Sequence, residues 1–198
     1  MTTKPQKVWV RPRAVGTTAA TPSSGHPVPI PLPTENIDQL KEDSDSFTLS
    51  SFTAEDAWVL GNLLRARLLP HAAHGQSALI SISLANSGQT VFQCVTGPGI
   101  TPDHEKWVQR KRNAVQRWTR STYRLNLQFS GDEARFKSIF QLSEEQANSY
   151  AIHGGAVPIR VPGVEGIVAI VIVSGLAQEE DHGVIADVIK SNWEEVEI

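Results

Sequence analysis

The chain has 198 residues, of which 40% are hydrophobic and 20% charged, a composition typical of one globular domain with some length to spare. Its net charge of −3 argues against a general polyanion-binding protein, and its single cysteine, Cys94, excludes an intramolecular disulfide and a cysteine-rich zinc site. The longest apolar run, residues 166–173, has the length of a strand, so we expect no membrane span.

The N-terminal segment is rich in proline. Seven of the twelve prolines lie in residues 1–33, and the alternating prolines at its end favour an extended polyproline conformation that builds no core. Residues 34–46 are acidic, with Ile37 and Leu40 placed for one short amphipathic helical turn. We therefore predict a disordered basic tail and acidic linker over residues 1–46. We predict that the tail is a spacer or, alternatively, a docking peptide for a proline-recognising module.

The N-terminal segment also bears on the cellular compartment in which the protein is expected. It lacks the apolar stretch of a secretory signal, and the lone cysteine indicates a reducing compartment, so we predict a cytoplasmic protein. The basic residues before Glu35 faintly resemble a mitochondrial presequence. However, the prolines among them would break the amphipathic helix that such a signal needs.

The folded domain is expected over residues 47–198. Thr53-Ala-Glu-Asp56 predicts the start of an amphipathic helix that ends at Pro70. Residues 78–84 and 90–96 then predict two strands of a hairpin, because they are strand-like runs separated by the turn sequence Asn-Ser-Gly.

A second helix follows, capped by Thr101 or Asp103, with a buried stripe that includes Trp107, Lys111 and Trp118. Residues 119–148 are predicted to be helical or irregular. The last elements are strands over residues 156–161 and 166–173 and a helix over residues 178–193. Because residues 166–173 are apolar on both faces, we expect a central strand in a sheet covered by helices on both sides.

Four segments carry a resemblance to a known family. In this order, the combination resembles the HbpS/GlcG-like family of haem-binding and haem-degrading domains, in its uncharacterised UPF branch, over roughly residues 50–195. The segments are Leu60–Arg65 (LGNLLR), Trp107–Val115 (WVQRKRNAV), Gly154–Arg160 (GGAVPIR) and Ser174–His182 (SGLAQEEDH). The resemblance implies an α+β fold, a profilin-like α/β/α sandwich with a central antiparallel sheet and helices on both faces. It also implies a homo-oligomer, a ring or a higher symmetric assembly.

The basic helix is the first candidate site. Seven basic residues against two acids lie between Asp103 and Arg124. Arginine binds carboxylates and phosphates through two parallel hydrogen bonds, so the segment Arg110-Lys111-Arg112-Asn113 is a candidate site for haem propionates or a phosphorylated ligand. Alternatively it is a solvated helix face or a subunit contact. No nucleic-acid partner is expected, because the chain is acidic overall. Lys111 lies on the buried stripe and needs a partner or a cleft, which makes it the favoured functional base.

The second candidate follows the central strand. Glu179 and His182 have the Glu-x-x-His spacing of metal-binding helices, and further ligands could come from a symmetry-related subunit or from His153. The alternative is a set of acids that complements the helix dipole, beside an exposed histidine. Gly154 and Gly155 form either a structural turn or a ligand loop.

Other motifs in the sequence give weaker evidence of a functional site. His71 and His74 have a ligand-like spacing but are predicted to lie in a loop. Cys94 is predicted to be a buried apolar residue. No P-loop, Gly-x-Ser-x-Gly or His-Glu-x-x-His sequence occurs in the chain, so nucleotide-binding, hydrolase and zinc-protease readings have no support.

Three hypotheses follow. The first is a binding protein for haem or a related anionic cofactor, with propionates near Arg110–Arg112, with His153 or His182 as axial ligand, and with haem degradation as an extension. The second is a non-enzymatic oligomeric adaptor with a protein partner, for example in protein targeting or chaperone complexes. The third is a small-molecule enzyme that uses Lys111 or His182 as acid or base. The sequence leaves open whether the chain is an enzyme, which ligand it takes and how many subunits it forms.

Overall fold

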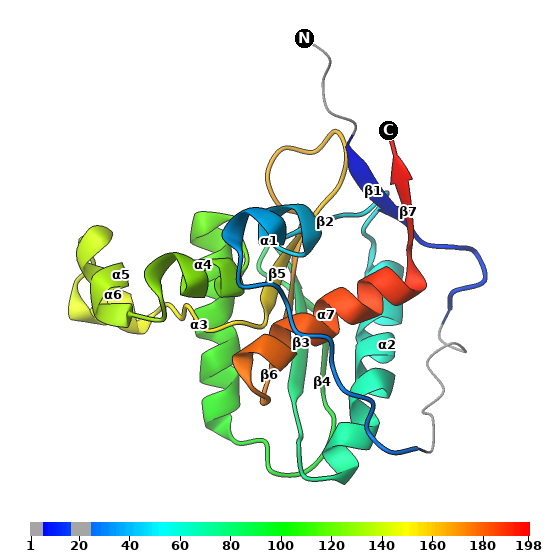
Figure 1. Cartoon of the computed structure of the whole chain (residues 1–198), viewed down its shortest axis with the longest axis horizontal. Helices are drawn as coiled ribbons and strands as arrows, with labels where there is room; N and C mark the ends of the chain where they lie inside the picture. The colour runs from blue at the N-terminus through cyan, green and yellow to red at the C-terminus, as the bar shows by residue number, and fades with distance from the viewer. Residues whose placement is uncertain (1–5, 17–24) are drawn as a thin grey trace.

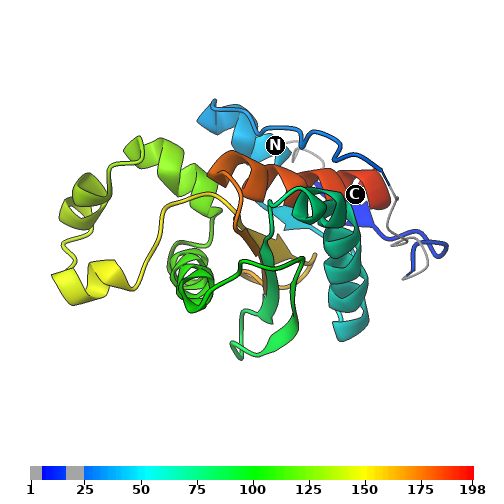
Figure 2. The ribbon, with the colours of Figure 1, turned by 90° about the horizontal axis from the view of Figure 1, so that it is seen from below.

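A computed structural model of the chain describes residues 6–16 and 25–198. A five-stranded, mostly antiparallel sheet forms its centre, in the order β2-β5-β6-β3-β4. Helices cover both faces of this sheet (Figures 1 and 2). The strands are β2 (Phe47–Thr48), β3 (Leu79–Leu84), β4 (Thr90–Val95), β5 (Ala156–Arg160) and β6 (Ala169–Ser174). The predicted α+β sandwich is therefore confirmed.

The middle strand β6 is buried along its whole length, as its apolar sequence predicts. Its side chains alternate between the two faces of the sheet. Val171 and Val173 join the main core with the helices α2 (Ala54–Ala73) and α7 (Gln178–Asn192). Ile170 and Ile172 face the helix α3 (Pro102–Trp118) on the other side. A site on the α3 side is thus separated from α2 by the thickness of the sheet.

Three short helices fill the region predicted to be helical or irregular. They project to one side of the sheet (Figure 1). Phe129 and Phe136 form a small aromatic core there together with Trp118 of α3. The three helices are α4 (Thr122–Phe129), α5 (Glu133–Ile139) and α6 (Glu144–Asn148).

The N-terminal segment differs from the disordered tail predicted over residues 1–46. The strand β1 (Lys7–Val10) pairs antiparallel with β7 (Glu194–Glu197). The helix α1 (Ile37–Asp43), which buries Leu40 completely, is the short amphipathic helical turn that the sequence predicts there. Residues 26–33, which we call the proline strap, lie along α2 and α7 with Ile30 buried. Apolar side chains that reach the core hold these residues in place. The rest of the predicted tail, residues 1–5 and 17–24, lies outside the described residues.

Helix α2 corrects a second prediction. It begins at Ala54, and Thr53 caps it, as predicted, through a capping box with Asp56. It does not end at Pro70 but continues through this proline to Ala73, so that His71 lies in the last helical turn rather than in a loop. His71 is buried, and its Nε2 lies 3.0 Å from the carbonyl oxygen of Val28 in the proline strap. This tertiary contact favours the helical turn despite the proline.

Among the described residues, no helix is long and apolar enough to cross a membrane. The structure also lacks, within those residues, any group of three or more His, Cys, Asp or Glu side chains that could hold a metal ion.

Candidate functional site

A cleft of about 330 Å³ lies where α3 meets the end of β6 and the start of α7. We call it the Lys111 cleft. Three parts of the chain line it: one face of α3, the loop before β5, and the turn from β6 into α7. The lining residues are His104, Trp107, Lys111, His153, Ser174, Gly175, Leu176, Gln178 and Asp181. Its volume lies near the lower end of the range of small-molecule sites, roughly 300 to 1,000 Å³.

A buried ion pair forms the base of this cleft. Lys111 Nζ donates to Asp181 Oδ2 at 3.0 Å and to the carbonyl oxygen of Val173 at 3.1 Å, and both side chains are 3% exposed. Asp181 also accepts a hydrogen bond from the backbone amide of Leu176. Burial raises the pKa of Asp181, and the charge of Lys111 and the hydrogen bonds oppose that rise. The backbone amide of Leu176, in the turn before α7, is therefore occupied by the chain's own carboxylate.

Gly154 and Gly155 shape the loop that passes over this ion pair. A Cβ on Gly154 would lie 2.3 Å from the carbonyl oxygen of Gln178. Gly155 has φ +106°, and a Cβ there would lie 2.4 Å from the carbonyl oxygen of Val173 and 2.8 Å from Lys111 Nζ. Neither glycine lines the cleft, but both let the loop approach α7 and Lys111 closely.

His153 stands at the mouth of the cleft. Its ring packs edge-on against Trp107, with ring centroids 5.0 Å apart, and Nδ1 is buried without a hydrogen bond, 3.6 Å from Glu133 Oε1. Within the described part of the chain, Nε2 makes no hydrogen bond. Burial lowers the pKa of His153, Glu133 opposes this, and Lys111 and Arg110 reinforce it. The lowered pKa favours the neutral imidazole, the form that a metal or haem ligand requires.

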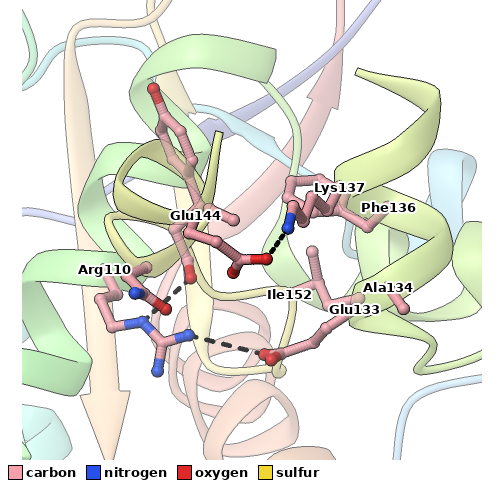
Figure 3. A pocket seen from close by; sticks show the side chains of 10 residues that line it. Arg110, Glu133, Ala134, Phe136, Lys137, Glu144 and Ile152 are labelled. Atoms are coloured by element: carbon pink, nitrogen blue, oxygen red, sulfur yellow. Dashed lines mark hydrogen bonds and ion pairs between the residues drawn. The ribbon is translucent and has the colours of Figure 1, made fainter. Parts of the chain in front are cut away.

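Arg110 connects the cleft to a second hollow. Its guanidinium stacks over Trp107 at 4.6 Å, donates to the carbonyl oxygen of Tyr150 and lies 3.6 Å from Glu133. Arg110 and Glu133 line the second hollow, of about 250 Å³, together with residues of α5 and α6. Figure 3 shows Arg110 reaching toward Glu133 there, and Lys137 toward Glu144. Glu133 thus lies between a cation and a histidine, both within 3.6 Å.

Two residues of the basic segment face away from the cleft. Arg112 donates to Ser81 on β3 and to Gln109, and burial lowers its pKa. Asn113 donates to the carbonyl oxygen of Ser149 beyond α6. The structure therefore divides the four predicted residues: Lys111 lines the cleft, Arg110 flanks it, and the other two serve packing contacts.

His182 is also separate from the cleft. It lies fully buried beside Tyr123, with ring centroids 5.1 Å apart, and its Nε2 is 3.4 Å from Ser44 Oγ. Burial lowers its pKa to about 4, and nearby Asp45 opposes this shift. Glu179 is partly buried in the first turn of α7. No third ligand joins Glu179 and His182 within the described residues, so this metal pair stays a prediction.

Several residues of the site, among them Trp107, His104 and Glu133, escaped the sequence analysis as functional groups. Trp107 was assigned only to a buried stripe, although it lines the cleft, and His104 and Glu133 were not considered. The spacing of His104, Trp107 and Lys111 over two helical turns could have placed them on one face of α3. Glu133 had no such signal, because only tertiary packing brings α5 to His153.

Comparison with known proteins gives a consistent family match. The family model described as "Haem degrading protein HbpS-like" matches residues 52–190. A UPF0303 protein of Streptomyces avermitilis is 36% identical over 154 residues, which are 78% of this chain and 88% of that protein. A UPF0303 protein of Serratia proteamaculans is 32% identical over 78% of this chain and 90% of its own length. The predicted resemblance is confirmed.

Solved structures agree with the fold. The crystal structure of the Ybr137w protein is similar with a TM-score of 0.70 and 30% identity, covering 79% of this chain and 86% of that one. A crystal structure of HbpS is similar with a TM-score of 0.50 and 19% identity, over 76% of this chain and 94% of that one. At that identity the likeness to HbpS concerns the fold.

Proposed function

We propose that this chain, which belongs to the HbpS-like family of haem-degrading proteins, binds haem or a related planar anionic cofactor in the Lys111 cleft. The observation that carries the proposal is His153. It is a partly exposed histidine that lines a cleft, with Nδ1 3.6 Å from Glu133 Oε1, and burial lowers its pKa, which favours the neutral form. Metal-binding histidines commonly donate one ring N–H to a carboxylate, which orients the ring and raises the basicity of the other nitrogen. The proposal requires His153 Nδ1 to close its 3.6 Å separation from Glu133 Oε1 when the ligand binds.

The residues around His153 fit such a ligand. Trp107 and Leu176 provide apolar surface for a macrocycle, and Arg110 provides a guanidinium for a propionate. The cleft would enclose one edge of the macrocycle rather than the whole of it. Bound haem would supply the redox chemistry, and the chain's own residues would hold the ring, bind a propionate and supply a histidine nitrogen as ligand. His182 is enclosed by Tyr123 and Ser44, so His153 is the histidine that would hold the haem.

Haemin titration followed by absorbance tests the proposal. We expect a saturable Soret shift with one haemin per chain for the wild type. His153→Gly should abolish the shift, and added imidazole should restore it by filling the space left by the side chain. His182→Gln, which changes a histidine outside the cleft, should leave the titration unchanged. Weak, non-saturating shifts that are equal in all three proteins would contradict haem binding.

Glu133→Gln tests the orienting role of the carboxylate. Loss of such a partner typically weakens metal affinity by about 10- to 100-fold. We expect a weaker haemin affinity, a small shift of the Soret maximum, and a lower pKa of His153, since Glu133 raises that pKa. An unchanged His153 pKa, measured by NMR titration without haemin, would remove Glu133 from the site.

We include assembly in the proposal. A homo-oligomer is what the family resemblance implies, and light scattering of the purified chain would measure its mass. A monomer at micromolar concentration would contradict this part and leave the haem part to its own test.

A further inference from the structure

The proline strap occupies a groove between α2 and α7, on the sheet face opposite to the Lys111 cleft. Ile30 is its single buried residue, at 6% exposure within the main core, whereas Val28 and Leu32 are 63% and 65% exposed. The strap thus inserts one aliphatic side chain and leaves its neighbours in solvent. A ligand peptide in a recognition groove has the same pattern of one anchor between exposed residues.

Arg67 of α2 donates hydrogen bonds to the backbone of the strap. Its NH1 donates to the carbonyl oxygen of Val28 and its NH2 to that of Pro29, both at 3.0 Å. Its Nε donates to Asp187 of α7 at 2.9 Å. All three nitrogens are therefore used, and Asp187 fixes the plane of the guanidinium toward two successive carbonyls.

Gly183 lets the strap lie directly on α7. A Cβ at this position would stand 2.2 Å from the carbonyl oxygen of Pro31 and 3.2 Å from Ile30 Cγ2. This glycine lies within a helix, where alanine would otherwise be more stable. Its lack of a side chain therefore serves the close approach of the strap.

The chemistry of this groove selects a proline-rich segment. Pro27, Pro29, Pro31 and Pro33 have no backbone N–H, so the strap presents mainly carbonyls, and Arg67 supplies the donors. Such a segment is already extended and loses little conformational entropy on binding. The strap also leaves a hollow of about 440 Å³ beside it, lined by residues of both helices and by its own prolines. The groove is larger than its present occupant.

We propose that the groove between α2 and α7 is a recognition site for a proline-rich peptide of another polypeptide chain. The peptide it takes is an extended segment with one aliphatic residue between two prolines. The proline strap fills the site as an intramolecular ligand that such a partner segment displaces. The proposal concerns the face opposite to the haem site and does not depend on haem binding.

Peptide binding to the full-length chain tests this assignment. The probe is a fluorescein-labelled peptide with the sequence of residues 25–36, and the measurement is fluorescence anisotropy. Wild type should bind it weakly, because its own strap competes. The graded variants Ile30→Val and Ile30→Ser weaken the strap while leaving the groove intact. We expect the apparent affinity to rise about fivefold for the first, from the loss of one buried methylene, and more for the second.

Matched variants separate recognition from nonspecific adhesion. When Gly183→Ala or Arg67→Ala is added to Ile30→Ser, we expect the double variant to bind the peptide at least tenfold more weakly than Ile30→Ser alone. Gly25→Ala, where a Cβ meets nothing within 4 Å, should change nothing in the same background. A labelled peptide carrying serine in place of Ile30 should not bind any of the proteins.

Two outcomes would overturn the proposal. The folding of Ile30→Val is checked by circular dichroism. If a titration carried to saturation gives this variant the same peptide affinity as wild type, the strap is only a structural part of the fold. If Ile30→Ser instead changes the mass of the assembly while no peptide binds, the strap belongs to a contact between copies. Haemin titration of Ile30→Val should match wild type in every case, so failure here is distinguishable from failure of the haem proposal.

Discussion

A charged lysine side chain can be buried only where its charge is compensated. Lys111 meets that condition through Asp181 and the carbonyl oxygen of Val173. The pair differs from surface ion pairs, which contribute little, because both partners are 3% exposed. Removing one partner leaves the other buried and uncompensated.

Lys111→Met should therefore lower the free energy of unfolding by roughly 3 to 5 kcal/mol, as for other buried pairs broken on one side. Asp181→Asn in the Lys111→Met background should recover part of this loss, because an amide oxygen can still accept from Leu176 without a charge. Urea denaturation of the two single variants and the double variant measures the coupling. Additive losses would mean that the two residues are energetically independent.

His182 makes stability depend on pH. Its pKa is lowered from 6.5 to about 4, so between these values the folded chain binds fewer protons than the unfolded one. The free energy of unfolding therefore falls as the pH falls through this window, by roughly 3 kcal/mol at about 1.4 kcal/mol per pH unit. His182→Gln, which does not titrate, should show a flatter pH profile in denaturation experiments. The raised pKa of Asp181 acts in the opposite direction in both proteins, so the difference between them reports His182. Parallel profiles would contradict this assignment.

Sequence reasoning at the residue scale could find Lys111 but not its surroundings. A lysine at a helical spacing of apolar residues is visible in one sequence, and it predicts burial. The identity of its partner is not visible, because Asp181 is one of three successive acids and only the packing of α7 selects it. For the same reason His182 was predicted as a ligand, although α7 turns it toward Tyr123.

At the scale of elements, the helix α2 shows how tertiary contacts outweigh a local signal. Pro70 removes one backbone donor from the last helical turns, yet the helix continues for three residues. Gly183 in α7 shows the converse, since a residue that disfavours helix is kept where the strap requires space. In the strand β6, local sequence and tertiary structure agree. Its central position was predictable from its apolar sequence alone.

Pro70→Ala restores the missing amide within α2. We expect the free energy of unfolding to rise by about 1 kcal/mol, because the added hydrogen bond and higher helix propensity exceed the entropy regained by the unfolded chain. Thermal and urea denaturation measure this change. A decrease would show that contacts of the proline ring beside the strap contribute more than the missing hydrogen bond.

At the scale of the whole molecule, the N-terminal segment is part of the fold. Val8 is 3% exposed, Trp9 packs against Phe47, and Arg11 forms an ion pair with Asp56 at 2.9 Å. Composition predicted a disordered tail because prolines and charges dominate it. A few apolar residues among them were sufficient for docking, and composition averages do not detect residues of that kind.

Val8→Ser should lower the free energy of unfolding by about 2 kcal/mol, since it removes a buried aliphatic side chain. The adjacent Lys7→Ser is a matched control. Its ion pair with Glu195 is half-exposed, so we expect little change in the free energy of unfolding. Equal small effects of both substitutions in urea denaturation would mean that β1 does not contribute to stability.

The pairing of β1 with β7 brings the two ends of the described chain together (Figure 1). Gln6 and Ile198 exchange two backbone hydrogen bonds of 3.1 Å at the outer end of this ladder. A pulling force applied between the termini would therefore load these bonds one after another, as in opening a zipper, instead of shearing them all at once. The β1–β7 ladder would open at low force while the five-stranded sheet carried almost no load. The molecule would yield in two mechanical stages, the first of which frees both arms without unfolding the core.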